Sequence, residues 1–285
     1  MDLLNKIFSP LKGKKNNRKY QDLSKESQRV APNTPSDLFI YARDIAGVQI
    51  QKMMEHLNDC KWVRAEYTYP SFDSMCFIYK NKVFSVIIDI QDEDGDSYLP
   101  EEYVKRQLYA CRENNLIPCK FCVIVDDAYN PDFEKAHPKN NGWNLYNTET
   151  NEIIIPEHMA TTEKIPLSDW EMRNFAIRYV LKYLKTKKLK IHSFQDTLEV
   201  DPQIWFDNEE GKKSWILVRA DKSPEKEVKK PKTLKEITRR CFKNDGYFAG
   251  VLLSPINEDE KDNNIYRMGS IRIDFHELEK IHSTI

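Results

Sequence analysis

Apolar side chains recur at helical spacing in two stretches of the chain, and each stretch opens with the same dipeptide. Ser36-Asp37 precedes a stretch whose apolar residues are Ala42, Ala46, Ile50, Met53 and Leu57. Ser168-Asp169 precedes a stretch that carries Met172, Ala176, Val180, Tyr183 and Leu184. Spacings of three and four residues indicate amphipathic helices, and serine is a favourable N-cap. The pattern predicts helices over 37–58 and 169–187.

Runs of β-favouring residues follow each predicted helix, and the two series have the same order. After the first helix we expect strands and one helix in the order 61–69, 75–79, 83–90, helix 100–114, 121–125, 143–146 and 152–155. After the second helix we expect 203–206, 214–220, helix 233–244, 247–253 and 266–275. Corresponding segments therefore lie at a nearly constant offset along the chain.

Short sequence matches support a duplication. The second helix of each series ends with a similar tetrapeptide, CREN at 111–114 and CFKN at 241–244, which lie 130 residues apart. A recurrence at a fixed offset identifies a repeated structural unit. The sequence thus predicts an α+β fold made of two tandem α-β-β-β-α-β-β repeats with mainly antiparallel sheets.

Length and composition agree with two domains that each have a core. The chain has 285 residues, 40% of them hydrophobic and 11% aromatic, with a net charge of −1. We expect a flexible basic tail over 1–35, a first repeat over 36–160 and a second over 161–285. The near-neutral charge gives no global attraction to nucleic acid. Scattered cysteines in apolar runs, with no apolar run of about 18 residues, predict a cytoplasmic protein with reduced thiols.

The first 35 residues have a character of their own. Leu3, Leu4 and Ile7 fall at helical spacing, and a basic run over 12–19 follows. A short amphipathic helix of this kind can lie on an anionic membrane surface. Prolines at positions 10, 32 and 35 interrupt the segment and favour a disordered tail instead.

Polar residues on the strands of the first repeat resemble a nuclease pattern. Asp73 starts the second strand, Asp89 and Gln91 lie on the third, and Glu66 lies on the first. The order α-β-β-β-α-β resembles the restriction-endonuclease-like core, whose strand carboxylates hold Mg²⁺ for phosphodiester cleavage. This resemblance implies a Mg²⁺ site at Asp73 and Asp89, with nucleic acid as the partner.

Two departures from that pattern weaken the nuclease interpretation. Gln91 stands where the family has a lysine, and an amide cannot act as a cation toward the transition state. In the second repeat Asp201 persists, but no paired acid appears on the third strand before Asp221. A divergent or inactive metal-dependent nuclease therefore remains the alternative prediction.

The element order of each repeat also resembles the type III secretion chaperone-like fold, which binds other proteins and has no catalytic residues or cofactor. Because no catalytic set is completed or repeated, we predict a non-enzymatic protein-binding module of the bacterial cytoplasm. An adaptor, a chaperone-like protein or an immunity-type protein would fit this description. Any exposed aromatic residue would anchor the interface. The candidates for that role are Trp62, Trp143, Trp215 and Tyr247.

Two further motifs receive structural interpretations. Cys119 and Cys122 have the spacing of a redox or zinc pair, but residues i and i+3 of a strand point to opposite faces. The helix over 233–244 is basic on one face through Lys235, Arg239 and Arg240. We interpret that face as an ordinary solvated surface; a phosphate-binding patch with Trp215 and Tyr247 available for stacking is the alternative.

Overall fold

The computed structural model describes residues 37–65, 74–126, 132–196, 200–222, 227–256 and 264–281. These residues form two compact units, with the boundary between Glu163 and Lys164. The sequence-based prediction set this boundary between 160 and 161. The basic tail over 1–35 lies outside the described residues.

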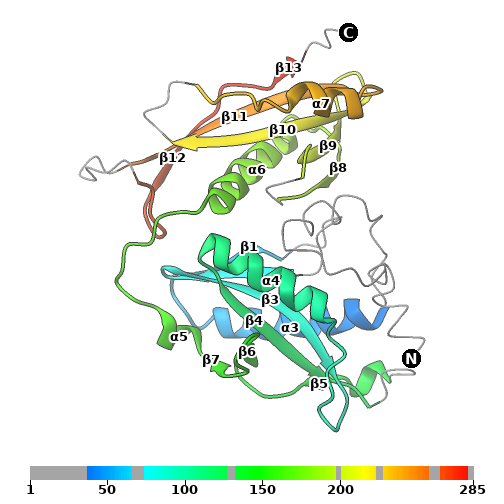
Figure 1. Ribbon diagram of the computed structural model, residues 1–285, viewed down its shortest axis with the longest axis vertical. Helices are drawn as coiled ribbons and strands as arrows, with labels where there is room; N and C mark the ends of the chain where they lie inside the picture. Colours follow the sequence, from blue (N-terminus) through cyan, green and yellow to red (C-terminus); the bar gives the residue numbers. More distant parts are fainter. Residues whose placement is uncertain are drawn as a thin grey trace, which may run out of the picture. The chain divides into compact units, whose positions relative to one another are not determined.

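The first unit is a mixed sheet with helices on both faces (Figure 1). Its elements, in chain order, are α3 (Asp37–Met54), β1 (Cys60–Arg64), β2 (Ser74–Tyr79), β3 (Lys82–Gln91), α4 (Glu101–Asn114), β4 (Ile117–Ile124), a 3₁₀ turn η3 (Phe133–Lys135), β5 (His137–Pro138), β6 (Leu145–Asn147), β7 (Ile153–Ile154) and α5 (Pro156–Met159). The strand order is β1-β2-β3-β4-β6-β7, with β5 beside β4. The β3–β4 pair is parallel and the others are antiparallel.

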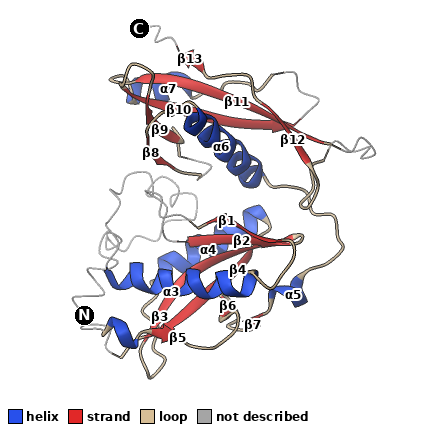
Figure 2. Ribbon diagram, turned by 180° about the vertical axis from the view of Figure 1, so that it is seen from behind, coloured by secondary structure: helices blue, strands red, loops and turns tan. Residues whose placement is uncertain are grey.

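The alternation of side chains along β3 assigns its two faces to different helices. Phe84, Val86 and Ile88 are buried in a core that includes α3, because successive strand residues point to opposite faces. The hydroxyl of Ser85 points the other way and contacts the thiol of Cys111 on α4. The sheet therefore lies between α3 and α4, as the opposite views in Figures 1 and 2 show.

The second unit repeats this arrangement. Its elements are α6 (Asp169–Thr186), β8 (Ile191–Phe194), β9 (Ile204–Asp207), β10 (Lys213–Lys222), α7 (Leu234–Arg240), β11 (Asp245–Pro255), β12 (Ile271–Asp274) and β13 (Glu279–Ile281). The strand order is β8-β9-β10-β11-β12, with β13 also paired to β11. As in the first unit, the parallel pair, β10–β11, is joined through the second helix.

Two cores cover the two faces of this second sheet. Ile216 and Val218 of β10 pack in the core that contains α6. Trp215 points to the opposite face, where it packs with Ile237 of α7. A Cβ atom at position 246 would lie 2.3 Å from the Trp215 indole, so β11 can approach this ring only at a glycine such as Gly246.

The structure confirms an α+β fold of two similar units with mainly antiparallel sheets. The first and second helices of each unit pack on opposite faces of its sheet, and the second helix connects the parallel strands. The N-terminus of α6 also follows the predicted signal, since Ser168 and Glu171 form a capping box. Among the described helices, none is long and apolar enough to cross a membrane.

Candidate functional site

Polar side chains meet on the α4 side of the first sheet, near the carboxyl ends of β3 and β4. Asp89 and Gln91 alternate with the apolar residues of β3, and Lys120 and Cys122 do the same on β4. The parallel register sets Asp89 beside Cys122. Ligands of open α/β sheets bind at the carboxyl ends of parallel strands, so this is the candidate site of the unit.

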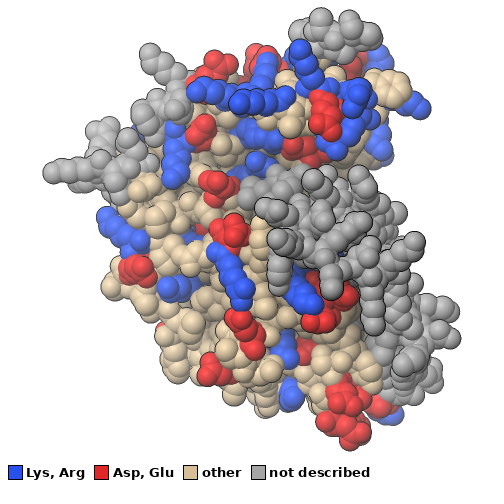
Figure 3. Space-filling view, viewed as in Figure 1, with Lys and Arg blue, Asp and Glu red and all other residues tan. Residues whose placement is uncertain are grey.

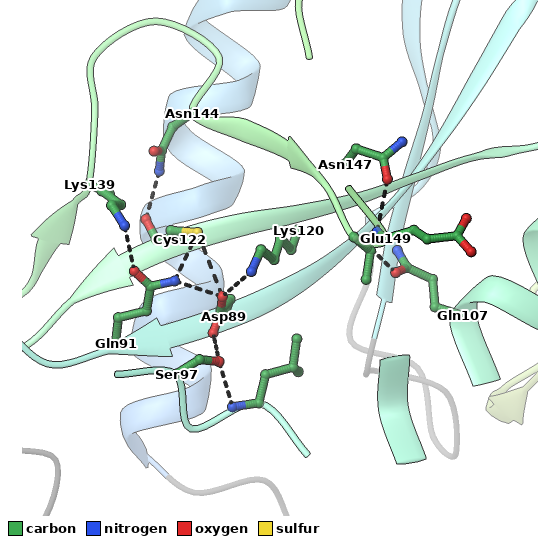
Figure 4. Close-up of polar contacts among 12 residues, drawn as sticks. Asp89, Gln91, Ser97, Gln107, Lys120, Cys122, Lys139, Asn144, Asn147 and Glu149 are labelled. Carbon is green, nitrogen blue, oxygen red and sulfur yellow. Dashed lines mark hydrogen bonds and ion pairs between the residues drawn. The ribbon is translucent and has the colours of Figure 1, made fainter. Parts of the chain in front are cut away.

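Asp89 is fully buried, and both of its carboxylate oxygens accept contacts (Figure 4). Oδ2 lies 3.0 Å from Nζ of Lys120 and 2.8 Å from Nε2 of Gln91. Oδ1 accepts a hydrogen bond from the hydroxyl of Ser97. The thiol of Cys122 lies 3.7 Å from Oδ2. A buried carboxylate is stable only when it is paired and hydrogen-bonded, and this network provides both.

A second layer of contacts holds the residues around Asp89. Nζ of Lys139 donates to Oε1 of Gln91 at 3.0 Å, which directs the amide nitrogen of Gln91 toward the carboxylate. The amide of Asn144 donates to the backbone carbonyl of Cys122 at 2.7 Å. Figure 4 shows these side chains converging from β3, β4 and the segment after β5. The orientation of Gln91 is therefore set from both ends of its amide.

The acidic turn after β3 returns the chain to the site. The amide N–H of Asp96 donates to Oδ1 of Asp92 at 2.8 Å, and the Tyr98 hydroxyl donates to the other oxygen of Asp92 at 2.8 Å. The bond from Tyr98 holds the pKa of Asp92 below its ordinary value. Ser97 pairs with Gln91 in an isolated bridge, which brings its hydroxyl to Asp89. The turn thus positions Ser97.

The chemistry of Cys122 is that of a buried thiol. Burial raises its pKa to about 12, and the charge of Asp89 adds to this effect, whereas Lys120 and Lys139 oppose it. A thiol of this kind is protonated at neutral pH and is a poor nucleophile. Cys119 packs in the core on the opposite face, so the two cysteines do not form a pair.

The second unit also has an acid–base pair, between Asp201 in the segment before β9 and Arg219 on β10. Oδ2 of Asp201 lies 2.7 Å from Nη2 of Arg219 on β10, and Oδ1 accepts from Nε2 of Gln203 at 2.6 Å. Both charged side chains are 14% exposed. In each unit an acidic side chain is thus neutralised by a cation from a strand of the sheet and bonded by a glutamine.

The structure brings together part of the predicted nuclease set. Asp89 and Gln91 lie side by side, whereas Asp73 and Glu66 fall outside the described residues. Among the residues that the structure describes, no three His, Cys, Asp or Glu side chains gather closely enough to hold a metal ion. A divalent cation at Asp89 would have to displace Lys120 from the carboxylate.

The aromatic residues considered as interface anchors pack within their own units. Trp143 is 5% exposed and stacks on Phe77 at a centroid distance of 5.4 Å, and Trp215 is fully buried. Trp62 and Tyr247 are half-buried and make edge contacts with core phenylalanines. The buried indoles contribute core packing and present no surface to a partner.

Lys120 is the site residue that the sequence analysis missed. It is the one cation in the otherwise apolar or small-residue strand IPCKFCVI, and its side chain is 16% exposed. A lysine inside a buried strand needs a counter-charge, which is the signal that could have identified it. Its partner lies 31 residues earlier, and only the parallel register of β3 and β4 brings the two together.

The fold and the site define a two-unit α+β protein in which Asp89 and Asp201 are each paired with a cation from a strand of the sheet. A protein-family model described as a domain of unknown function (DUF8840) matches residues 170–281. This match spans most of the second unit, from the start of α6 to the end of β13. No curated protein and no solved structure matches the chain.

Proposed function

We propose that this chain is a non-enzymatic protein-binding module of the bacterial cytoplasm, built on a scaffold whose element order resembles that of restriction-endonuclease-like and type III secretion chaperone-like proteins. The observation that carries the proposal is the closed network around Asp89, with Lys120 at 3.0 Å. A catalytic carboxylate that recruits Mg²⁺ needs oxygen lone pairs available to the ion. Here each oxygen already accepts from a protein donor, and the ammonium of Lys120 lies against the carboxylate where a metal ion would have to bind.

The second unit supports the same proposal. Asp201, which precedes β9, is paired with Arg219 of β10, so this acid of the second unit also has a cationic partner. The six cysteines are free thiols, which fits a reducing compartment. A duplicated scaffold with its acids neutralised is suited to presenting surfaces to a partner.

An exposed apolar edge of the first sheet supports a protein partner. β7 ends the strand order, and its Ile153 is 69% exposed. Ile155 and Met159, just beyond the strand and on α5, are 38% and 39% exposed. An edge strand with unpaired backbone groups and apolar side chains can accept a strand from another protein. We expect the partner to bind along β7 and α5.

Affinity capture from native cells tests this proposal. The tagged full chain should retain one stoichiometric protein after nuclease treatment and a salt wash, and Ile153→Glu should reduce its recovery at least about tenfold, because a charge would be buried in the interface. Val48→Glu is the matched control, since Val48 is 57% exposed on α3 of the same unit. Equal recovery with both variants, or no captured protein, would contradict the proposal.

A divergent metal-dependent nuclease is the second candidate, and Lys120 is the observation that favours it. The ammonium that is missing at Gln91 is supplied beside Asp89 from the neighbouring strand. In such an enzyme a cation near the metal-binding acid can stabilise charge that develops on the transferred phosphate. Metal binding would then require Lys120 to move from Asp89 toward the substrate.

A further inference from the structure

The surface of α7 and the turn that follows it is strongly basic. Between residues 227 and 244 the sequence contains seven Lys or Arg residues and two Glu residues. We use the name α7 basic face for six exposed side chains, Lys232, Lys235, Arg239, Arg240, Phe242 and Lys243. Figure 3 shows Lys and Arg side chains gathered at the end of the second unit that carries α7.

The cations of this face lack acidic partners within the protein. Some other lysines of the second unit form ion pairs, for example Lys230 with Glu279 and Lys280 with Asp245. Within the parts of the chain that the structure describes, no carboxylate forms an ion pair with Lys232, Lys235, Arg239, Arg240 or Lys243. Because seven Lys or Arg residues stand against two Glu residues, one of them the exposed Glu236 of α7, the segment over 227–244 has a net charge of +5.

An aromatic ring stands among these cations. Phe242 is 74% exposed, and Nζ of Lys243 lies 5.8 Å from the centre of its ring. A phenylalanine exposed to this extent contributes little to folding, because most of its apolar surface is not buried. Its position therefore suits contact with a ligand that has both negative charge and flat apolar groups.

The structure holds the backbone on both sides of Phe242 in place. Ile237 anchors α7 in the core beneath it, with 1% exposure. In the turn, the side-chain amide of Asn244 donates to the backbone carbonyl of Lys213 at 2.9 Å. The backbone carbonyl of Asn244 accepts from the Trp215 indole N–H at 3.2 Å. Phe242 thus projects from a turn that is tied to β10, which lowers the entropy lost when it binds a ligand.

We propose that the α7 basic face binds single-stranded nucleic acid, with phosphates on the Lys and Arg side chains and a base stacked on Phe242. Positively charged grooves with aromatic rings are the common solution for sequence-independent binding of single strands. A duplex hides its base faces inside the stack and would not use the ring. This inference does not depend on the protein-binding proposal, since it concerns a separate surface in the second unit.

Fluorescence anisotropy with labelled oligo(dT) of about 15 nucleotides tests the inference on the full chain. Arg239→Glu/Arg240→Glu should weaken binding at least about tenfold at low salt. The plot of the log of the association constant against the log of the salt concentration should become shallower by about 1.4, because two phosphate contacts are lost. The matched control is Lys182→Glu/Lys185→Glu, which makes the same charge change on exposed residues of α6 and should retain most of the affinity.

The ring is tested separately from the charge. Phe242→Ala should weaken binding about tenfold while the salt slope stays the same, because stacking releases no counterions. The proposal is overturned if the wild-type protein does not bind the oligonucleotide, if Phe242→Ala binds like wild type, or if both charge reversals weaken binding equally. It is also overturned if anionic phospholipid vesicles or polyglutamate compete as well as the oligonucleotide, since either result would indicate attraction by charge alone.

Discussion

Lys120→Met is expected to lower the free energy of unfolding of the first unit by about 3 kcal/mol, because it leaves the buried Asp89 without its counter-charge. Methionine keeps much of the volume of the lysine stem, so the loss of charge is the main change. Urea denaturation of the full chain measures the effect, and hydrogen exchange in β3 and β4 assigns the transition to the first unit.

The double variant Asp89→Asn/Lys120→Met provides the internal control. Asparagine removes the charge but can still accept from Ser97 or Gln91, so most of the lost stability should return. The coupling energy in this double-mutant cycle should be about 2 kcal/mol. If the effects of the two substitutions on the free energy of unfolding are additive, the ion pair of Asp89 and Lys120 does not stabilise the unit. That result would contradict the role of Lys120 as the partner that neutralises Asp89.

Arg267→Met is expected to destabilise the second unit by about 3–5 kcal/mol, because it removes one partner of an almost fully buried ion pair. Nε and Nη2 of Arg267 donate to the two carboxylate oxygens of Glu171 at 2.7 and 2.8 Å, and the side chains are 1% and 5% exposed. Glu171 also caps α6 through the backbone N–H of Ser168. Removing Arg267 would therefore destabilise the N-terminus of α6 as well as break the ion pair.

The same denaturation experiment measures this effect, with hydrogen exchange in α6 as the local probe. Glu171→Gln/Arg267→Met should recover part of the stability, because glutamine is neutral and can still bond the Ser168 N–H. A loss of less than about 1 kcal/mol in Arg267→Met would show that the pair is solvated in solution. The protection of the first unit should not change in either variant.

Local signals made most of the fold predictable. The pairing of Ser168 with Glu171 marks the start of α6, and the nearly continuous apolar run of β3 marks a strand covered on both faces. Where a turn forms without a clear sequence signal, the prediction was wrong. One strand was expected over 266–275, but β12 covers only Ile271–Asp274, since Met268 has a φ of 66° and a turn forms there.

The candidate site was predictable only in part, for the same reason. Asp89 and Gln91 belong to one strand, so their common face follows from alternation along the sequence. Lys120 and Lys139 come from other segments, and the register of the sheet and the loop after β5 bring them to Gln91 and Asp89. The sequence shows that Gln91 replaces the lysine of the nuclease motif, but it does not show that Lys120 and Lys139 reach Asp89 and Gln91 from other segments.

A cleavage assay tests the central claim most directly. The full chain would be incubated with single- and double-stranded DNA and RNA in Mg²⁺ or Mn²⁺, beside Asp89→Asn and a reaction with EDTA. Because the oxygens of Asp89 are occupied by Lys120, Gln91 and Ser97, the account predicts no cleavage above the EDTA reaction for either protein. Metal-dependent cleavage by the wild type that is lost in Asp89→Asn, with an unchanged circular dichroism spectrum, would contradict it.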